Sequence, residues 1–151
     1  MIAPAPSLQP RYSLLHREVE TEILPHCQSE GIGVIVYSPM ASGLLTGAMN
    51  RDRIASLPKD DWRKGHSDFN EPNLSRHLAP VDHLKEIARR RGGSAGEVAL
   101  ASDNAQSGGD RGYRRRTQRS PGGRRKRAGE LRLTDKAVHE IEHFASTERA
   151  A

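Results

Sequence analysis

The chain has 151 residues, of which 34% are hydrophobic and 4% aromatic, so it can form one modest, mainly aliphatic core. Its single cysteine, Cys27, excludes an intrachain disulfide and a disulfide-rich secreted scaffold, and we expect a reducing, cytoplasmic setting. No apolar run approaches the roughly 18 residues of a membrane-spanning helix. The proline-rich first ten residues lack the basic start of a signal peptide.

The net charge of +5 is concentrated in one segment. Residues 102–127 contain nine Lys or Arg and two Asp, a charge of +7, whereas the rest contains 15 basic and 17 acidic residues, a charge of −2. The segment is also rich in Gly and nearly free of apolar residues, so we expect it to be disordered. The composition therefore divides the chain into three predicted parts: residues 1–101, the basic segment 102–127, and a C-terminal helical part, 128–151.

The first part begins with alternating strand and helix patterns. Residues 7–12 form a short strand candidate, and residues 17–30 carry apolar side chains at helical spacing, with Gly31 as the stop. Residues 32–37 are a compact β-branched run, typical of a strand buried on both faces. This order predicts an α/β fold with a parallel sheet.

The second half of that part is predicted to be helical after a long irregular stretch. Residues 43–72 are polar and irregular, with Trp62 and Phe69 as candidate hydrophobic anchors, and residues 81–91 form an amphipathic helix. Ser94-Ala-Gly-Glu is a capping box that opens another helix.

The C-terminal part is predicted to be one amphipathic helix. Thr134 is its N-cap, and Val138, Ile141 and Phe144 or Ala145 share one stripe.

Two stretches resemble the aldo-keto reductases: Leu-Gln-Pro-Arg-Tyr-Ser-Leu-Leu at residues 8–15, and Gly-Ile-Gly-Val-Ile-Val-Tyr-Ser-Pro-Met-Ala-Ser-Gly-Leu-Leu-Thr-Gly at residues 31–47. Residues 18–27 and 69–76 fit the same family, and the resemblance covers about residues 1–101 and 128–148. It implies a TIM-type (β/α)₈ barrel, and the chain would contain its C-terminal portion, from near the sixth strand. The expected fold is therefore an incomplete α/β barrel.

The resemblance also implies a site for NADPH and a small carbonyl substrate, an aldehyde or ketone. Gln9 would hydrogen-bond the nicotinamide carboxamide and Tyr37 would stack on the nicotinamide ring. From the residues alone, the favoured interpretation of Tyr37 is a packing residue at a strand end. The residues expected to line the pyrophosphate loop are Ser38, Met40, Ser42, Gly43 and Leu44. Gly and Ser leave backbone N–H groups accessible to phosphate.

The chain departs from the family in its catalytic residues. The family's catalytic Tyr, Lys, Asp and His have no match here, so we assign no catalytic residue. We expect little or no carbonyl reduction by this chain and weak or lost NADPH binding. An open barrel edge would expose apolar surface and favour self-association.

The segment 102–127 stands where the family has its eighth strand and the loop that binds the adenosine 2′-phosphate. With suitable synonymous codons, a one-base shift from Ser102 gives Thr-Met-Arg-Asn-Pro-Ala-Val-Thr-Gly-Ala-Ile-Val, close to the family's strand. We interpret the segment as frameshifted, with compensation near Arg127. The alternative is a non-enzymatic protein that binds nucleic acid or another partner through the Arg-rich residues 111–127.

His139-Glu-Ile-Glu-His matches the H-E-x-x-H pattern of zinc proteases. A third ligand at the required spacing is lacking, so we interpret the pattern as the polar face of the last helix and predict no metal. Cys27 is interpreted as a small buried hydrophobic residue.

Overall fold

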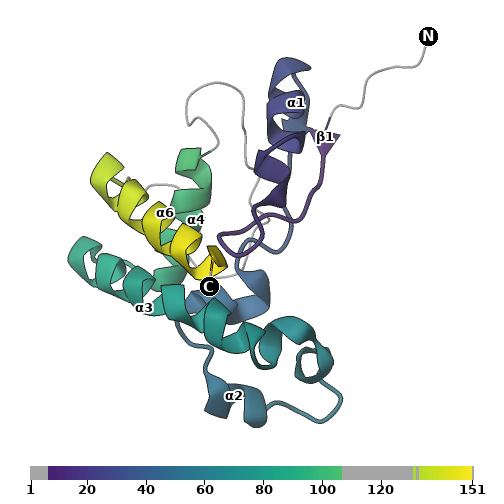
Figure 1. The fold of residues 1–151 in the computed structure, drawn as a ribbon, viewed down its shortest axis with the longest axis vertical. Coiled ribbons are helices and arrows are strands. Elements are labelled where there is room, and N and C mark those ends of the chain that lie inside the picture. The colour runs from purple at the N-terminus through teal and green to yellow at the C-terminus, as the bar shows by residue number, and fades with distance from the viewer. Residues whose placement is uncertain (1–6, 107–130, 132, 151) are drawn as a thin grey trace.

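The computed structural model describes residues 7–106, 131 and 133–150 (Figure 1). Its strands are β1 (Ser7–Leu8) and β2 (Gly33–Val34). Its α-helices are α1 (Ile23–Ser29), α2 (Arg51–Ala55), α3 (Asn73–Arg91), α4 (Ala95–Gln106) and α6 (Asp135–Ala150). Four short 3₁₀ helices are η1 (Glu18–Glu20), η2 (Ala41–Thr46), η3 (Trp62–Gly65) and η4 (Ser67–Phe69).

The two strands pair in parallel, as the strand–helix–strand order predicts. Ser7 lies opposite Gly33 and Leu8 opposite Val34. Both strands are shorter than predicted: each contains two residues in regular pairing. Proline has no N–H to donate, so Pro10 interrupts the ladder. An isolated parallel bridge nevertheless pairs Arg11 with Tyr37 in the same register.

The predicted helix over 17–30 is divided into η1 and α1. Pro25 lies in the first turn of α1, where its missing N–H is tolerated. If α1 extended further towards the N-terminus, the Pro25 ring would clash with the carbonyl of Thr21. This clash explains why η1 and α1 are separate helices. The predicted stop is confirmed: Gly31 has φ +65°, and Ile32 N–H donates to the Cys27 carbonyl at 2.8 Å. Cys27 is buried, as predicted.

The stretch 43–72 contains short helical turns, and only one of its two candidate anchors is in the core. Phe69 is 2% exposed, whereas Trp62 is 58% exposed, so the prediction of Trp62 as a core anchor was wrong. The Trp62 ring instead meets Phe69 edge-to-face, with the ring centroids 5.9 Å apart.

The helix α3 begins at Asn73, eight residues before the predicted start, and includes Pro80. Burial of Leu74 anchors the added turns. The Glu71 carboxylate also accepts hydrogen bonds from the N–H and hydroxyl of Ser75, at 3.1 and 2.6 Å. Burial of Leu74 and these local hydrogen bonds therefore extend the helix through Pro80, the residue just before its predicted start.

Both predicted caps are confirmed. Ser94 N–H donates to the Glu97 carboxylate at 2.7 Å, and Glu97 N–H donates to the Ser94 hydroxyl at 3.3 Å. At the start of α6, Ala137 N–H donates to the Thr134 hydroxyl at 3.4 Å.

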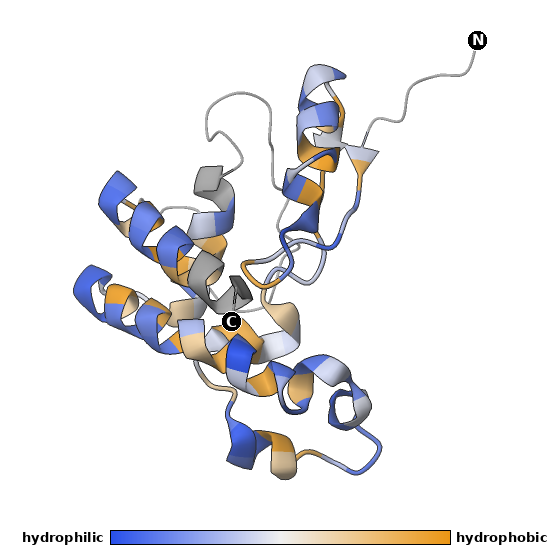
Figure 2. Cartoon of the chain, in the orientation of Figure 1, coloured by the Kyte–Doolittle hydropathy of each residue, from blue (hydrophilic) through white to orange (hydrophobic). Residues whose placement is uncertain are grey.

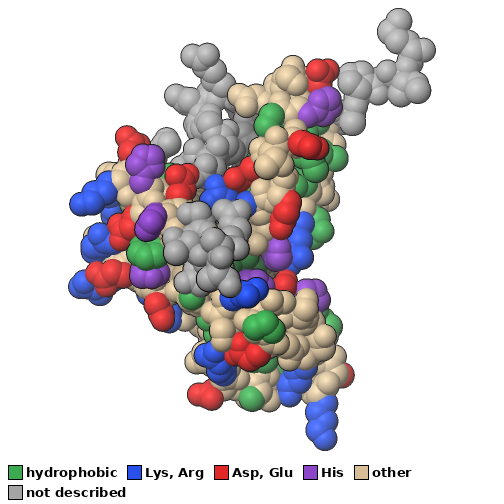
Figure 3. Space-filling view, in the orientation of Figure 1, with side chains coloured by type: hydrophobic (Ala, Val, Ile, Leu, Met, Phe, Trp, Pro, Cys, Tyr) green, Lys and Arg blue, Asp and Glu red, His purple; other side chains and the backbone are tan. Residues whose placement is uncertain are grey.

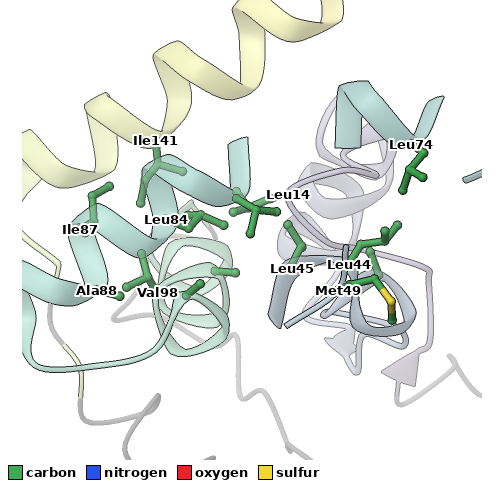
Figure 4. Close-up of a cluster of buried hydrophobic side chains, with 14 of the residues drawn as sticks. Leu14, Leu44, Leu45, Met49, Leu74, Leu84, Ile87, Ala88, Val98 and Ile141 are labelled. Atoms are coloured by element: carbon green, nitrogen blue, oxygen red, sulfur yellow. The ribbon is translucent and has the colours of Figure 1, made fainter. Parts of the chain in front are cut away.

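The helices α3, α4 and α6 enclose most of the core, and the loops after β1 and β2 complete it (Figure 4). Polar residues cover the outer turns of α3 and α6, and hydrophobic residues gather between the helices (Figure 2). The buried side chains labelled in the close-up are Leu14, Leu44, Leu45, Met49, Leu74, Leu84, Ile87, Ala88, Val98 and Ile141. Arg90 of α3 also pairs with Glu140 of α6 at 2.8 Å.

We predict that Leu84→Ala lowers the free energy of unfolding by about 2–5 kcal/mol, because this side chain is 1% exposed and its removal leaves a cavity. Urea unfolding of the full chain measures the change. Arg89→Ala is the matched control on the same helix, since its side chain is exposed and pairs with nearby Glu86. That control is expected to change stability by less than about 1 kcal/mol. Equal effects of the two substitutions would contradict the placement of Leu84 in the core.

Candidate functional site

Tyr37 follows β2, with its backbone held and its ring open to solvent. Tyr37 N–H donates to the Pro10 carbonyl at 3.0 Å, and its carbonyl accepts from Tyr12 N–H at 3.3 Å. The side chain is 49% exposed. The main chain therefore fixes the position of Tyr37, and its ring is accessible to a flat partner.

Gln9 lies on the same face as Tyr37 in the parallel register. Because Arg11 pairs with Tyr37, the same offset places Gln9 opposite Ile35. Residues two apart on an extended strand share a face, so Gln9 and Tyr37 face the same side. Gln9 is also exposed, which leaves its amide available for hydrogen bonding.

The loop after Tyr37 has an unusual backbone. Ser38, Ala41 and Ser42 have φ values of +57°, +45° and +53°, and Gly43 follows at +107°. Non-glycine residues rarely adopt this left-handed region, and such strain clusters at functional sites. Turns of this kind bring successive N–H groups to one side and can bind anions. The Ser38 and Ser42 hydroxyls also approach each other at 3.5 Å.

Two residues expected in the pyrophosphate loop use their side chains for packing. Leu44 is fully buried in the core, so it can face a ligand only through its backbone. The Met40 side chain packs against α4, where a Cβ added to Gly96 would collide with its terminal methyl group.

A second close approach joins the loop to α4. Gly47 has φ +80°, and an added Cβ would lie 3.1 Å from the Cβ of Ala95. The small residues Ala95 and Gly96, which lie between the two capping-box residues Ser94 and Glu97, thus support the loop. Sequence reasoning missed this support, although two small residues at a helix start are compatible with close packing.

Asp68 joins the segment after β1 to α3. Its carboxylate accepts a hydrogen bond from Arg11 at 2.8 Å and lies 3.4 Å from Nε2 of His16. His77 donates through Nδ1 to the Asp68 carbonyl at 3.1 Å, since a carbonyl can only accept. Nδ1 of His66 accepts from Asp68 N–H at 3.2 Å. These contacts fix the segment that continues from Gln9.

Burial and charge shift the pKa values within this cluster. Burial lowers the pKa of His16, and the charge of Arg11 adds to the shift while Asp68 opposes it. For Asp68, burial acts to raise the pKa, but the Arg11 hydrogen bond and the charges of His16 and His77 outweigh it and the pKa is lowered.

The buried tyrosine next to the cluster is held in its neutral form. The Tyr12 hydroxyl donates to Glu20 at 2.5 Å, and Arg17 holds that carboxylate at 2.7 and 2.9 Å. Burial and the Glu20 hydrogen bond both raise the pKa of Tyr12. Tyr12 is therefore a structural group and a poor proton donor.

The H-E-x-x-H pattern lies on α6, and His139 is exposed there, 3.5 Å from the Glu142 carboxylate. Within the described residues, no group of three or more His, Cys, Asp or Glu side chains could hold a metal ion. No helix in the described part of the chain has the length and apolarity needed to span a membrane.

The basic segment is described only at its start. The helix α4 continues to Gln106, and Ser102 and Asp103 are buried. Residues 107–130 lie outside the described residues. The predictions of disorder, a shifted reading frame and nucleic-acid binding fall mainly there.

Comparison with known proteins identifies the class. The model of the Aldo/keto reductase family matches residues 2–102. The aldo-keto reductase YhdN of Bacillus subtilis is 32% identical over 94 residues, which cover 62% of this chain and 28% of that protein. The solved glycerol dehydrogenase of Gluconobacter oxydans superposes with a TM-score of 0.74 at 28% identity, covering 97% of this chain and 44% of that one.

The chain therefore belongs to the aldo/keto reductase family, whose fold is a TIM barrel. The resemblance of residues 8–15 and 31–47 to this family is confirmed. The small parallel sheet with its helices is consistent with part of the family's barrel. The chain spans between about a quarter and a half of the length of these two relatives.

We predict that the folded chain loses stability as the pH falls below about 6.5. Because burial lowers the pKa of His16, the unfolded state binds its proton first, and protonation favours unfolding from that pH downward. The lowered pKa of Asp68 adds a further loss below about pH 4. Urea unfolding between pH 8 and 3.5 measures both effects.

His16→Gln should flatten the dependence between pH 7 and 5, whereas the control His139→Gln, on an exposed position, should leave it unchanged. An unaltered slope in the His16 variant would show that another group carries the effect.

Proposed function

We propose that the described residues form the nicotinamide and pyrophosphate part of an NADPH site, in an oxidoreductase that reduces aldehydes or ketones. The observation that carries the proposal is the exposed ring of Tyr37 on the same face of the strand pair as Gln9, followed at once by a loop with left-handed backbone. Family membership supports the same assignment. When bound, NADPH supplies the hydride.

Each part of the site has a distinct task. The Tyr37 ring offers a flat face for stacking, and the Gln9 amide can both donate to and accept from a carboxamide. The loop from Ser38 to Gly43 presents backbone N–H groups and two hydroxyls to the pyrophosphate. Leu44 contributes its backbone only, because its side chain fills the core.

None of these residues is assigned a catalytic role. Tyr12 is buried and hydrogen-bonded to Glu20, and Tyr37 is assigned to stacking on the nicotinamide ring. We therefore expect the chain by itself to oxidise NADPH with a reactive aromatic aldehyde at a rate close to that of buffer. Turnover well above that rate would show that the chain contains a proton donor outside this assignment.

We predict that Tyr37→Ala weakens NADPH binding about tenfold, or about 1.4 kcal/mol, because the stacking face is lost. The wild-type affinity is expected to be weak, since the segment 102–127 stands in place of the family's loop that binds the 2′-phosphate. Isothermal titration calorimetry of the full chain measures both constants.

Trp62→Ala is the matched control, because Trp62 is an exposed aromatic residue outside the proposed site. No binding by the wild type, or the same loss in both variants, would overturn the proposed site.

Exposed apolar side chains support the proposed self-association. Leu8 of β1 and Ile23 of α1 are both exposed. In the described sheet, each of the two strands pairs along one edge only. An unpaired edge beside apolar side chains favours pairing with another chain.

The alternative function, binding of nucleic acid through residues 111–127, is favoured only by the +7 charge of the segment 102–127. Such binding would be non-specific and would weaken steeply with salt. Nucleic-acid binding that persists after deletion of residues 111–127 would exclude this alternative.

A further inference from the structure

Tyr12 connects the proposed nicotinamide site to the 3₁₀ helix η1. Its N–H donates to the Tyr37 carbonyl at 3.3 Å, and this is one of the two backbone contacts that hold Tyr37. Its ring is buried, and its hydroxyl donates at 2.5 Å to Glu20, eight residues further along the chain. The position of the Tyr12 ring and that of the Tyr37 backbone are therefore linked.

The Glu20 carboxylate is itself held in place. Arg17 donates through Nε to one carboxylate oxygen at 2.7 Å and through a terminal nitrogen to the other at 2.9 Å. This paired geometry fixes the orientation of the carboxylate. Between Tyr12 and η1, Ser13 and His16 exchange backbone hydrogen bonds of 3.1 and 2.9 Å, which turn the chain back on itself. Glu20 is thus a fixed acceptor for the Tyr12 hydroxyl.

The pair of Arg17 and Glu20 is better shielded from solvent than the ion pairs on the helical surface. Basic and acidic side chains are mixed over α3 and α6 (Figure 3), and solvent screens exposed pairs of this kind. The Arg17 side chain is only 8% exposed, and a hydrogen bond to a charged, shielded group is stronger. Burial and the Glu20 hydrogen bond raise the pKa of Tyr12, so its hydroxyl keeps the proton that it donates.

We propose that Tyr12, anchored by Glu20, is a positioning residue that fixes Tyr37 for stacking on the nicotinamide ring. Its effect on binding rests on the proposed NADPH site, whereas the anchoring of Tyr37 does not require NADPH. Without the anchor, the segment of Pro10 to Tyr12 that makes both backbone contacts with Tyr37 would move more freely. Ordering it on binding would then cost affinity.

Tyr12→Phe removes only the hydroxyl, and amide hydrogen exchange of the full chain followed by NMR tests its effect on Tyr37. The Tyr12 and Tyr37 amides donate the two backbone hydrogen bonds. We expect them to exchange about fivefold faster relative to amides in the central turns of α3. The relative rate separates local loosening from a loss of global stability.

Thr134→Ala is the matched control, because loss of this N-cap also destabilises the chain but acts at the start of α6. It should leave the relative exchange rates of Tyr12 and Tyr37 unchanged. Relative rates in Tyr12→Phe that equal those of the wild type, or the same change in both variants, would overturn the proposal.

Isothermal titration calorimetry with NADPH tests the consequence for binding. Tyr12→Phe should weaken binding several-fold in the wild-type background and cause no further loss in Tyr37→Ala, because it acts through the Tyr37 ring. An equal loss in both backgrounds would indicate a merely structural role and refute the proposal.

The same titrations separate this proposal from that of the NADPH site. Weaker binding by Tyr37→Ala with unchanged binding by Tyr12→Phe would leave the site in place and refute the positioning role. No binding by the wild type would refute the site and, with it, the effect of Tyr12 on the cofactor. The exchange rates would then still decide whether Tyr12 fixes Tyr37.

Discussion

The candidate cofactor site depends on two backbone hydrogen bonds that hold Tyr37 against the segment after β1. Main-chain atoms make both contacts, so the side chain is not needed to fix the residue in place. Its ring can therefore remain exposed, although exposure of a large aromatic side chain forgoes the stabilisation of burial. The direction of the following loop is set by the same pairing, because Ser38 begins the left-handed turns immediately after Tyr37.

That loop is supported on its other side by the start of α4. The capping box of Ser94 and Glu97 fixes where the helix begins, and the first turn then presents Ala95 and Gly96 to the loop. Met40 can pack there only because position 96 lacks a side chain. A local feature of the sequence, the helix cap, thus positions a loop that lies about fifty residues earlier in the chain.

Features governed by neighbouring residues could be predicted from the sequence, and those governed by distant contacts could not. The caps at Ser94 and Thr134 and the stop at Gly31 each involve residues within a few positions. The first turns of α3 were missed because their stability comes from burial of Leu74. The Asp68 cluster was missed because Arg11 lies 57 residues away. The roles proposed for Gln9 and Tyr37 came from family resemblance alone.

The net positive charge of the chain is a poor guide to where it would bind an anion. Residues 18–50, which include the whole proposed pyrophosphate loop, contain neither Lys nor Arg. Attraction for a phosphate there must come from N–H groups and the hydroxyls of Ser38 and Ser42, which act only over short distances. An anion site can thus be proposed outside the segment that carries the excess of basic residues, because local donor geometry decides binding there.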